Sequence, residues 1–152
     1  MRKRIKVYMD TSVISALFDD RNQQRQVLTQ RFFEDVDTFD AYVSELVLAE
    51  IDGTRDVGLR SKLREIATRF KLLPIDEKDR TIAREYVRHG AIPPDYSEDA
   101  LHISMASANG MDYLLSRNFE HIVKLKTRRI VSMVNASLGY PDLAIATPAE
   151  LL

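Results

Sequence analysis

The fold of this chain is decided by the stretch Lys6–Ile14, KVYMDTSVI. Its apolar first half predicts a strand at 5–9, and Asp10 ends that strand before two hydroxyl residues lead into a helical pattern. A strand that passes directly into a helix is typical of a parallel α/β sheet, whose ligand crevices lie at the carboxyl ends of the strands. Asp10 is therefore the first candidate site residue, although the dipole of a helix N-terminus also favours an acid there.

Strands and helices alternate along the remaining chain. Ser12, Ser44 and Ser97 are expected to cap helices, because serine hydroxyls accept hydrogen bonds from the first free amides. The alternation, without a repeat or a linker, predicts one α/β domain, residues 1–152, with a mostly parallel sheet of about five strands. Further strands are predicted at 39–43, 71–75, 112–116 and 143–146, and helices at 12–18, near 27–36, at 44–53, 59–70, 76–88 and 97–109, and within 123–138, with a last helical turn at 147–152.

The composition excludes several classes of protein. The 152 residues include no cysteine, which removes disulfides, thiolate metal sites and cysteine nucleophiles and suits a reducing cytoplasm. The formal net charge of -1 gives no general attraction to polyanions, so a nucleic-acid surface has to be a local basic patch. Asp10 interrupts the first apolar stretch too early for a signal peptide, and no stretch approaches the roughly 20 apolar residues of a membrane span. We therefore expect a cytoplasmic protein without membrane contact.

Glu50 is a second candidate, because it lies on the apolar face of the helix predicted to begin at Ser44. Leu46 and Val47 precede it by one helical turn, and residues at that spacing share one face. A carboxylate on a buried face needs a partner or a metal ion. The alternative is that Glu50 reaches water at the helix end and pairs with Arg55.

Asp99 is a third candidate, in the first turn of the most apolar helix. Ile103 and Ala106 follow it at helical spacing, which predicts that this helix is buried along most of its girth. A buried helix would bring Asp99 to the edge of the sheet. The alternative is an acid that only favours the helix N-terminus, with Ser97 as the cap.

Asn118 follows the strand 112–116 by two residues, so it shares the strand-end position of Asp10. It can equally be an ordinary turn asparagine, and Asp112, at the other end of the strand, is excluded from the site. Three carboxylates and an amide, without His or Cys, indicate a site for a hard cation, Mg²⁺ or Mn²⁺. Such an ion activates water for attack on a phosphate, which is the chemistry of phosphodiester hydrolysis.

Five segments, in this order, resemble the PIN domain family, and more narrowly the VapC-type ribonuclease toxins of bacterial and archaeal toxin–antitoxin pairs. The resemblance spans the whole chain. It implies a three-layer α/β/α fold and endonucleolytic cleavage of RNA that depends on Mg²⁺ or Mn²⁺. The matching segments are VYMDTSVI at 7–14, LAEI at 48–51, DALHISMA at 99–106, GMDYLLSRNF at 110–119 and TPAELL at 147–152.

The resemblance also implies roles for individual residues. Asp10, Glu50 and Asp99 would hold the metal, and Thr11 or Ser12 would support the site through its hydroxyl. The family commonly forms homodimers and is silenced by a small antitoxin that occupies the cleft. The family often has a fourth acid where this chain has Asn118, so the resemblance favours catalysis with one metal ion over catalysis with two. Asn118 itself would contact a metal-bound water or a phosphate oxygen.

Basic residues near the proposed cleft are candidates for RNA contacts through phosphate charge. A second basic group, around the helix 59–70, is interpreted as solvated surface. His102 is interpreted as packing against a backbone partner, with a hydrogen bond to Asp99 or to a substrate phosphate as the alternative. The candidates for RNA contact are Arg117 and the cluster Lys124, Lys126, Arg128 and Arg129, whose alternative is also a solvated helix face.

Three functional hypotheses remain open on the sequence. The first is a metal-dependent endoribonuclease that acts as the toxin of a toxin–antitoxin pair. The second, motivated by Asn118, is a catalytically weak or inactive PIN-like module that binds RNA or protein. The third is a phosphatase on a similar sheet, and the lack of a second acid just after Asp10, as in an Asp-x-Asp pair, argues against it.

Overall fold

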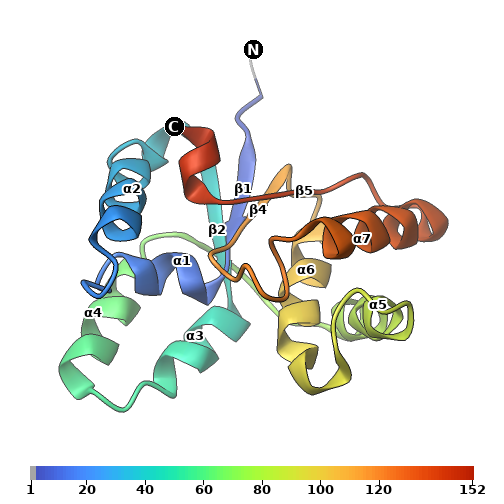
Figure 1. Ribbon diagram of the computed structural model, residues 1–152, viewed down its shortest axis with the longest axis horizontal. Coiled ribbons are helices and arrows are strands. Elements are labelled where there is room, and N and C mark those ends of the chain that lie inside the picture. Colours follow the sequence, from blue (N-terminus) through green and yellow to red (C-terminus); the bar gives the residue numbers. More distant parts are fainter. Residues whose placement is uncertain (1–2) are drawn as a thin grey trace.

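Five parallel strands form the centre of the molecule, in the order β3-β2-β1-β4-β5 (Figure 1). The computed structural model describes residues 3–152. The predicted α/β class and the number of strands are confirmed, and every pairing in the sheet is parallel. The strands are β1 (Lys6–Met9), β2 (Asp40–Ser44), β3 (Lys71–Leu73), β4 (Tyr113–Leu115) and β5 (Ala144–Ala146).

Helices cover both faces of the sheet and complete three layers. In Figure 1, α1, α2 and α4 lie on one side of the sheet and α5, α6 and α7 on the other. No helix in residues 3–152 is long and apolar enough to cross a membrane. The helices are α1 (Thr11–Ala16), α2 (Gln23–Glu34), α3 (Glu45–Asp52), α4 (Val57–Ala67), α5 (Glu77–Arg88), α6 (Ser97–Ala108) and α7 (Leu125–Leu138), with short 3₁₀ turns η1 (Val36–Thr38), η2 (Pro94–Tyr96) and η3 (Pro148–Leu151).

The order of strands places a topological switch point between β1 and β4. The chain runs from β1 outward through β2 to β3 on one side, and from β4 to β5 on the other. Met9 and Leu115 are register partners, so both strands end at the same level. A crevice outside the carboxyl ends of the strands is expected at such a point, and Asp10 lies directly beside it.

Two of the three predicted helix caps are wrong. Asp10, with extended backbone angles, caps α1 itself, because its carboxylate accepts a hydrogen bond from the amide of Val13. Ser12 therefore lies inside the first turn of α1, and Ser97 is likewise the first helical residue of α6. The third prediction is confirmed, since the Ser44 hydroxyl accepts from the amide of Val47 at the start of α3.

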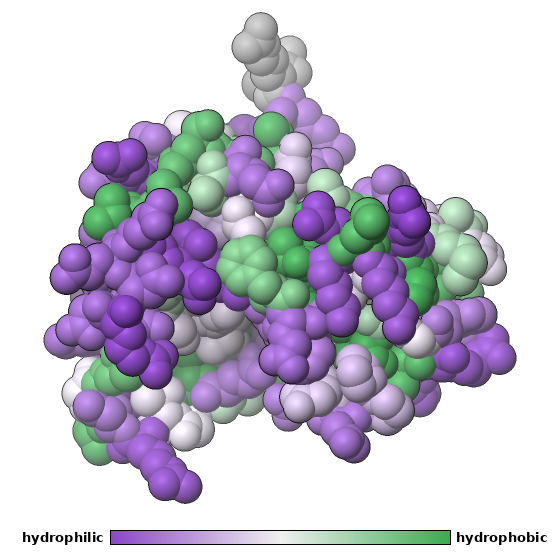
Figure 2. All heavy atoms as spheres, in the orientation of Figure 1, coloured by the Kyte–Doolittle hydropathy of each residue, from purple (hydrophilic) through white to green (hydrophobic). Residues whose placement is uncertain are grey.

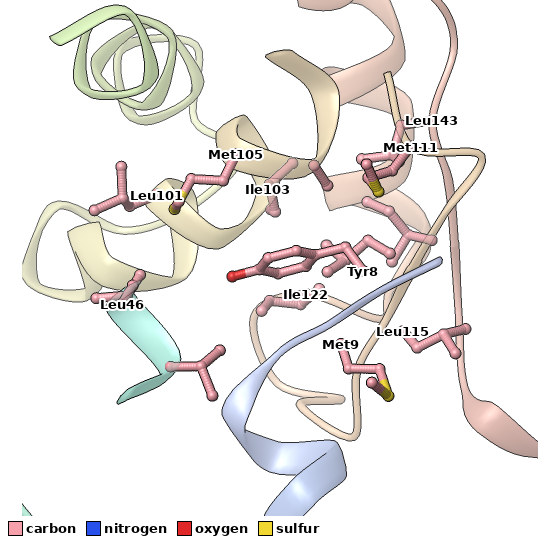
Figure 3. Packing of buried hydrophobic residues seen from close by; sticks show 14 of the residues in the cluster. Tyr8, Met9, Leu46, Leu101, Ile103, Met105, Met111, Leu115, Ile122 and Leu143 are labelled. Carbon is pink, nitrogen blue, oxygen red and sulfur yellow. The ribbon is translucent and has the colours of Figure 1, made fainter. Parts of the chain in front are cut away.

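The core below the switch point between β1 and β4 contains a buried tyrosine, Tyr8. Tyr8, fully buried on β1, extends among Ile103 of α6 and Ile122, as Figure 3 shows. Its hydroxyl oxygen points away from the strand toward the side of Leu46 and Leu101. A buried hydroxyl needs a hydrogen-bond partner, so the core here must supply polar groups. The helix α6 is buried along most of its length, as its sequence predicts.

Candidate functional site

The carboxylate of Asp10 is only 3% exposed and is held by neutral donors. The Ser12 hydroxyl donates to Oδ1 at 2.5 Å, and the Ser116 hydroxyl donates to Oδ2 at 2.5 Å. Each serine oxygen in turn accepts a backbone amide from the segment after β4, Arg117 at 2.8 Å and Asn118 at 2.9 Å. The ends of β1 and β4 are therefore tied together through the carboxylate of Asp10.

Glu50, on α3, lies at the end of a chain of buried polar contacts. His102 Nε2 donates to Glu50 Oε1 at 2.6 Å, and Thr11 Oγ1 donates to the same oxygen at 2.5 Å. The other imidazole nitrogen, Nδ1, lies 2.7 Å from the hydroxyl of Tyr8, which is 2.8 Å from the hydroxyl of Ser44. The interpretation of His102 as packing against a backbone partner is thus wrong, because both of its ring nitrogens contact side chains. Glu50 forms no ion pair with Arg55 within the described chain.

Asp99, in the first turn of α6, is contacted by the segment that follows β4. The amide nitrogen of Asn118 donates to Asp99 Oδ2 at 3.2 Å, and His121 Nδ1 lies 3.2 Å from the same oxygen. The Asn118 amide oxygen accepts the backbone amide of His121 at 3.0 Å. Asn118 therefore links Asp99 to the turn that carries His121, and both ends of its side chain are engaged by protein groups.

Burial and charge make this edge of the sheet electrostatically unusual. Burial raises the pKa of Asp10 and of Asp99 above their usual values, although the charge of His102 opposes the shift in both. Burial also acts on Glu50, but the hydrogen bond and the charge of His102 outweigh it, so the pKa of Glu50 is lowered. For His102 burial is outweighed by the contact with Glu50 and by the charges of Asp10 and Asp99, which raise its pKa. The three carboxylates therefore act on one imidazole.

The acidic side chains at this edge have the chemistry of a divalent-cation site, because hard cations prefer carboxylate oxygens as ligands. Asp10 accepts hydrogen bonds only from hydroxyl and amide groups of the described chain, so no basic side chain neutralises it by contact. As arranged here, no group of three or more His, Asp or Glu side chains within residues 3–152 could hold a metal ion. Coordination by Asp10, Glu50 and Asp99 together would therefore require rotation of their side chains.

The basic candidates for RNA contact separate into two kinds. Arg117 points its guanidinium to α2, where Nη2 donates to Thr29 Oγ1 at 3.1 Å and to the carbonyl of Arg25 at 3.2 Å. Lys126, Arg128 and Arg129 stay exposed on the first turns of α7, and Lys124 is the half-buried residue before that helix.

Three side chains of the second basic group, around α4, form surface ion pairs. Its contacts include Arg64 with Asp52 at 2.9 Å, Arg69 with Glu65 at 3.3 Å and Lys71 with Asp40 at 2.7 Å. Such exposed pairs contribute about 0–1 kcal/mol each. The interpretation of this group as solvated surface rather than a binding patch stays a prediction.

Sequence reasoning missed three residues that structure the site. Ser116 closes the strand predicted at 112–116, and its position level with Asp10 was the signal that could have identified it. His121 lies one turn after Asn118 and reaches Asp99 from there. Tyr8 gave no signal, because a buried tyrosine hydroxyl is expected to find a hydrogen-bond partner but no local pattern says which one.

Comparison with known proteins agrees with the fold, and the family match covers four of the five segments named in the sequence, all except 147–152. The PIN domain family model matches residues 7–125. No curated protein matches the sequence significantly.

Solved structures with a similar fold include complexes and a toxin. One is VapBC2 from Rickettsia felis bound to a DNA fragment from their promoter, with a TM-score of 0.61, 16% identity, and coverage of 93% of this chain and 97% of that chain. The DNA-bound VapBC from Salmonella typhimurium also has a TM-score of 0.61 at 16% identity, over 95% and 98% of the two chains. Mycobacterium tuberculosis VapC20, described as a Sarcin-Ricin loop cleaving toxin, has a TM-score of 0.58 and 17% identity, over 90% and 97%. The family match, the parallel sheet and the similarity in fold agree, and the chain belongs to the PIN domain family.

Proposed function

We propose that this chain is a metal-dependent endoribonuclease, the toxin of a toxin–antitoxin pair. One observation supports the proposal above all others. Asp10 after β1, Glu50 on α3 and Asp99 on α6 come from distant parts of the chain, and their charges act on the same imidazole at the carboxyl edge of the sheet. A concentration of buried acid at this edge is costly unless a cation balances it, which favours a functional site.

The chain's own residues would prepare the acids for this task. Ser12 and Ser116 fix the carboxylate of Asp10, and Thr11 and His102 fix that of Glu50. When bound, Mg²⁺ or Mn²⁺ would lower the pKa of a coordinated water and neutralise charge on the phosphate. Among the basic candidates, Lys124, Lys126 and Arg128 are proposed to hold RNA phosphates, while Arg117 is proposed to keep the segment after β4 docked on α2.

The partners are proposed by analogy with the similar structures. The Rickettsia and Salmonella structures are VapBC complexes on DNA, and the Mycobacterium protein is described as cleaving the Sarcin-Ricin loop. We extend this pattern to the present chain: a single PIN domain, forming a homodimer, that cleaves RNA and is bound by a small antitoxin in the cytoplasm. Co-expression with a short neighbouring reading frame tests the pairing, because a cognate antitoxin should copurify with the chain and relieve its toxicity.

RNA cleavage by the purified chain is the direct test. Cleavage is expected with Mg²⁺ or Mn²⁺ and should be lost in EDTA, in Asp10→Asn and in Asp99→Asn. Lys62→Ala, on the outer surface of α4, is the matched control and should cleave like the wild type. Cleavage that persists in both acid variants would refute the metal-site proposal.

A PIN-fold module that binds RNA or protein without cutting is the alternative function. It is favoured by Asn118, whose amide is engaged with Asp99 and His121 and replaces an acid with a neutral group. Calorimetric titration with Mg²⁺ and Mn²⁺ separates the two functions. Specific binding in the low-millimolar range or tighter supports the nuclease, and no binding together with intact RNA capture supports the module.

A further inference from the structure

Two exposed aromatic side chains lie next to the acidic edge of the sheet. Tyr96 ends η2 just before α6 and is 47% exposed, and Phe119 directly follows Asn118 and is 46% exposed. They are the only large aromatic side chains in residues 3–152 with this degree of exposure. Figure 2 shows apolar atoms on this face of the molecule over the segment between β4 and α7, amid largely hydrophilic surroundings. Both rings are therefore accessible to solvent, next to the segments that carry Asp99 and Asn118.

Tyr96 is held beside Asp99 through an aromatic contact. Its ring centroid lies 3.9 Å from that of His121, with 39° between the ring planes. His121 in turn contacts Asp99 Oδ2 at 3.2 Å. The tyrosine is therefore positioned by the same histidine that positions the acid, and its exposure leaves ring surface open to a ligand.

The positively charged side chain of Arg25 lies over the ring of Phe119. The guanidinium carbon of Arg25 lies 5.4 Å from the ring centroid, a cation–π distance. The carbonyl of Arg25 also accepts a hydrogen bond from Arg117, so α2 and the segment after β4 are fixed to each other at this point. A ring paired with an arginine offers a stacking surface and a phosphate-binding charge at one place.

We propose that Tyr96 and Phe119 are stacking platforms for two unpaired nucleobases of an RNA whose phosphodiester lies at Asp10, Glu50 and Asp99. This inference rests on the proposed ribonuclease function and assigns two residues to its substrate-binding surface. Aromatic side chains stack on bases that have left a helix, whereas the bases of duplex RNA are occupied by their own stacking. The platforms accept any base because every base has a π face.

The test measures RNA binding separately from cleavage. The full chain with Asp10→Asn, in Mg²⁺, is titrated with a fluorescein-labelled single-stranded RNA of ten nucleotides that contains one 2-aminopurine. Tyr96→Leu and Phe119→Leu keep an apolar side chain but remove the ring, and Tyr96→Phe and Phe119→Tyr keep the ring as matched controls. We expect each leucine variant to lose about 5- to 160-fold in affinity, the effect of one stacked base, and both ring-keeping variants to bind like their parent.

Two further readouts assign any loss to stacking. The fluorescence of 2-aminopurine should be quenched more strongly on binding to the parent than on binding to either leucine variant. An RNA of ten abasic nucleotides should bind the parent and the leucine variants equally, because no base is left to stack.

The outcomes test the stacking platforms and the ribonuclease function separately. If both leucine variants cleave RNA like the wild type and bind it with unchanged affinity, the stacking platforms are refuted and the ribonuclease function is not. Platform-dependent RNA binding without any metal-dependent cleavage would support the platforms and refute the ribonuclease. An unchanged RNA affinity together with loss of a copurifying protein partner from the leucine variants would overturn the RNA assignment and make this a protein-binding surface.

Discussion

His102 and Glu50, 52 positions apart in sequence, share the shortest contact between a basic and an acidic side chain in the described chain, 2.6 Å from Nε2 to Oε1. The imidazole is buried, while Glu50 is only half-buried and reaches the edge of the sheet. Tyr8 holds the other imidazole nitrogen at 2.7 Å. The orientation of a proposed metal ligand is thus set from inside the core.

Replacing His102 should therefore uncouple Glu50 from the core. We expect His102→Leu to raise the pKa of Glu50, because burial remains while the contact that opposes it is removed. Metal affinity and cleavage should fall together, and removal of one partner of a buried polar pair should destabilise the fold by about 1–3 kcal/mol. Urea unfolding measures the stability change, and calorimetry the metal affinity. Tyr86→Phe is the control, since it removes a buried hydroxyl that contacts Ser107 and Asn135 rather than His102. An unaltered metal affinity in His102→Leu would show that the histidine does not position Glu50.

Asp10→Asn should stabilise the metal-free protein near pH 7. Burial raises the pKa of Asp10, so its ionised form costs folding free energy at neutral pH, and an asparagine removes that charge while keeping the cap of α1. Tm should rise by about 2–4 °C for each kcal/mol relieved. In Mg²⁺, the wild type should gain Tm from the bound ion, and the variant should lose that gain. Thermal scans in EDTA and in Mg²⁺ measure the two effects. A variant that melts below the wild type in EDTA would contradict it.

The His102–Glu50 pair should contribute stability within a window of pH. The pKa of His102 is raised from 6.5, so its contribution is present at low pH and is lost as pH rises through the raised value. The pKa of Glu50 is lowered from 4.5, so its contribution is present above that pH and is lost as pH falls through the lowered value. The difference in unfolding free energy between wild type and Glu50→Gln, measured in EDTA, should be largest between these limits. A difference that is constant across pH would exclude an ionic pair.

Asn118→Asp places a fourth acid in the site, at the position where this chain has an amide. The substitution would place a carboxylate 3.2 Å from Asp99 Oδ2, in place of the donating amide. Repulsion should raise the pKa of Asp99 further and lower the stability of the metal-free protein, while the added charge should strengthen Mg²⁺ and Mn²⁺ binding. Calorimetry and thermal scans measure the two effects. Weaker metal binding by this variant would mean that the Asn118 amide has a positive role in the site.

The charge cluster on α7 is tested by the salt dependence of RNA binding. Lys126→Ala and Arg128→Ala should each weaken binding for every RNA sequence, because each removes a charge proposed to hold a phosphate. Each such removal should reduce the slope of log K against log[salt] by about 0.7 on single-stranded RNA. Lys62→Ala, on α4, should leave the slope unchanged. Equal slopes for all three variants would remove the α7 cluster from the RNA surface.

The order of elements was readable from the sequence because it depends on short-range physics. Apolar runs of strand length, helical spacing of apolar residues, and a cap such as Ser44 act over one or two turns, and each identified its element to within a few residues. The alternation of strand and helix then required a parallel sheet. Even here the local rule erred at α1, because Asp10 serves as the cap and leaves Ser12 free to bind the carboxylate.

The contacts that orient the candidate site were decided by tertiary structure alone. Ser116 reaches Asp10 across 106 positions and His102 reaches Glu50 across 52, and no local pattern marks such pairs. They exist because the strand order puts β1 beside β4, with α6 packed where its one buried histidine meets α3. The sequence by itself determined which acids stand at strand and helix ends. Only the packed fold, in which each buried polar group must find a partner, decided which side chains hold them.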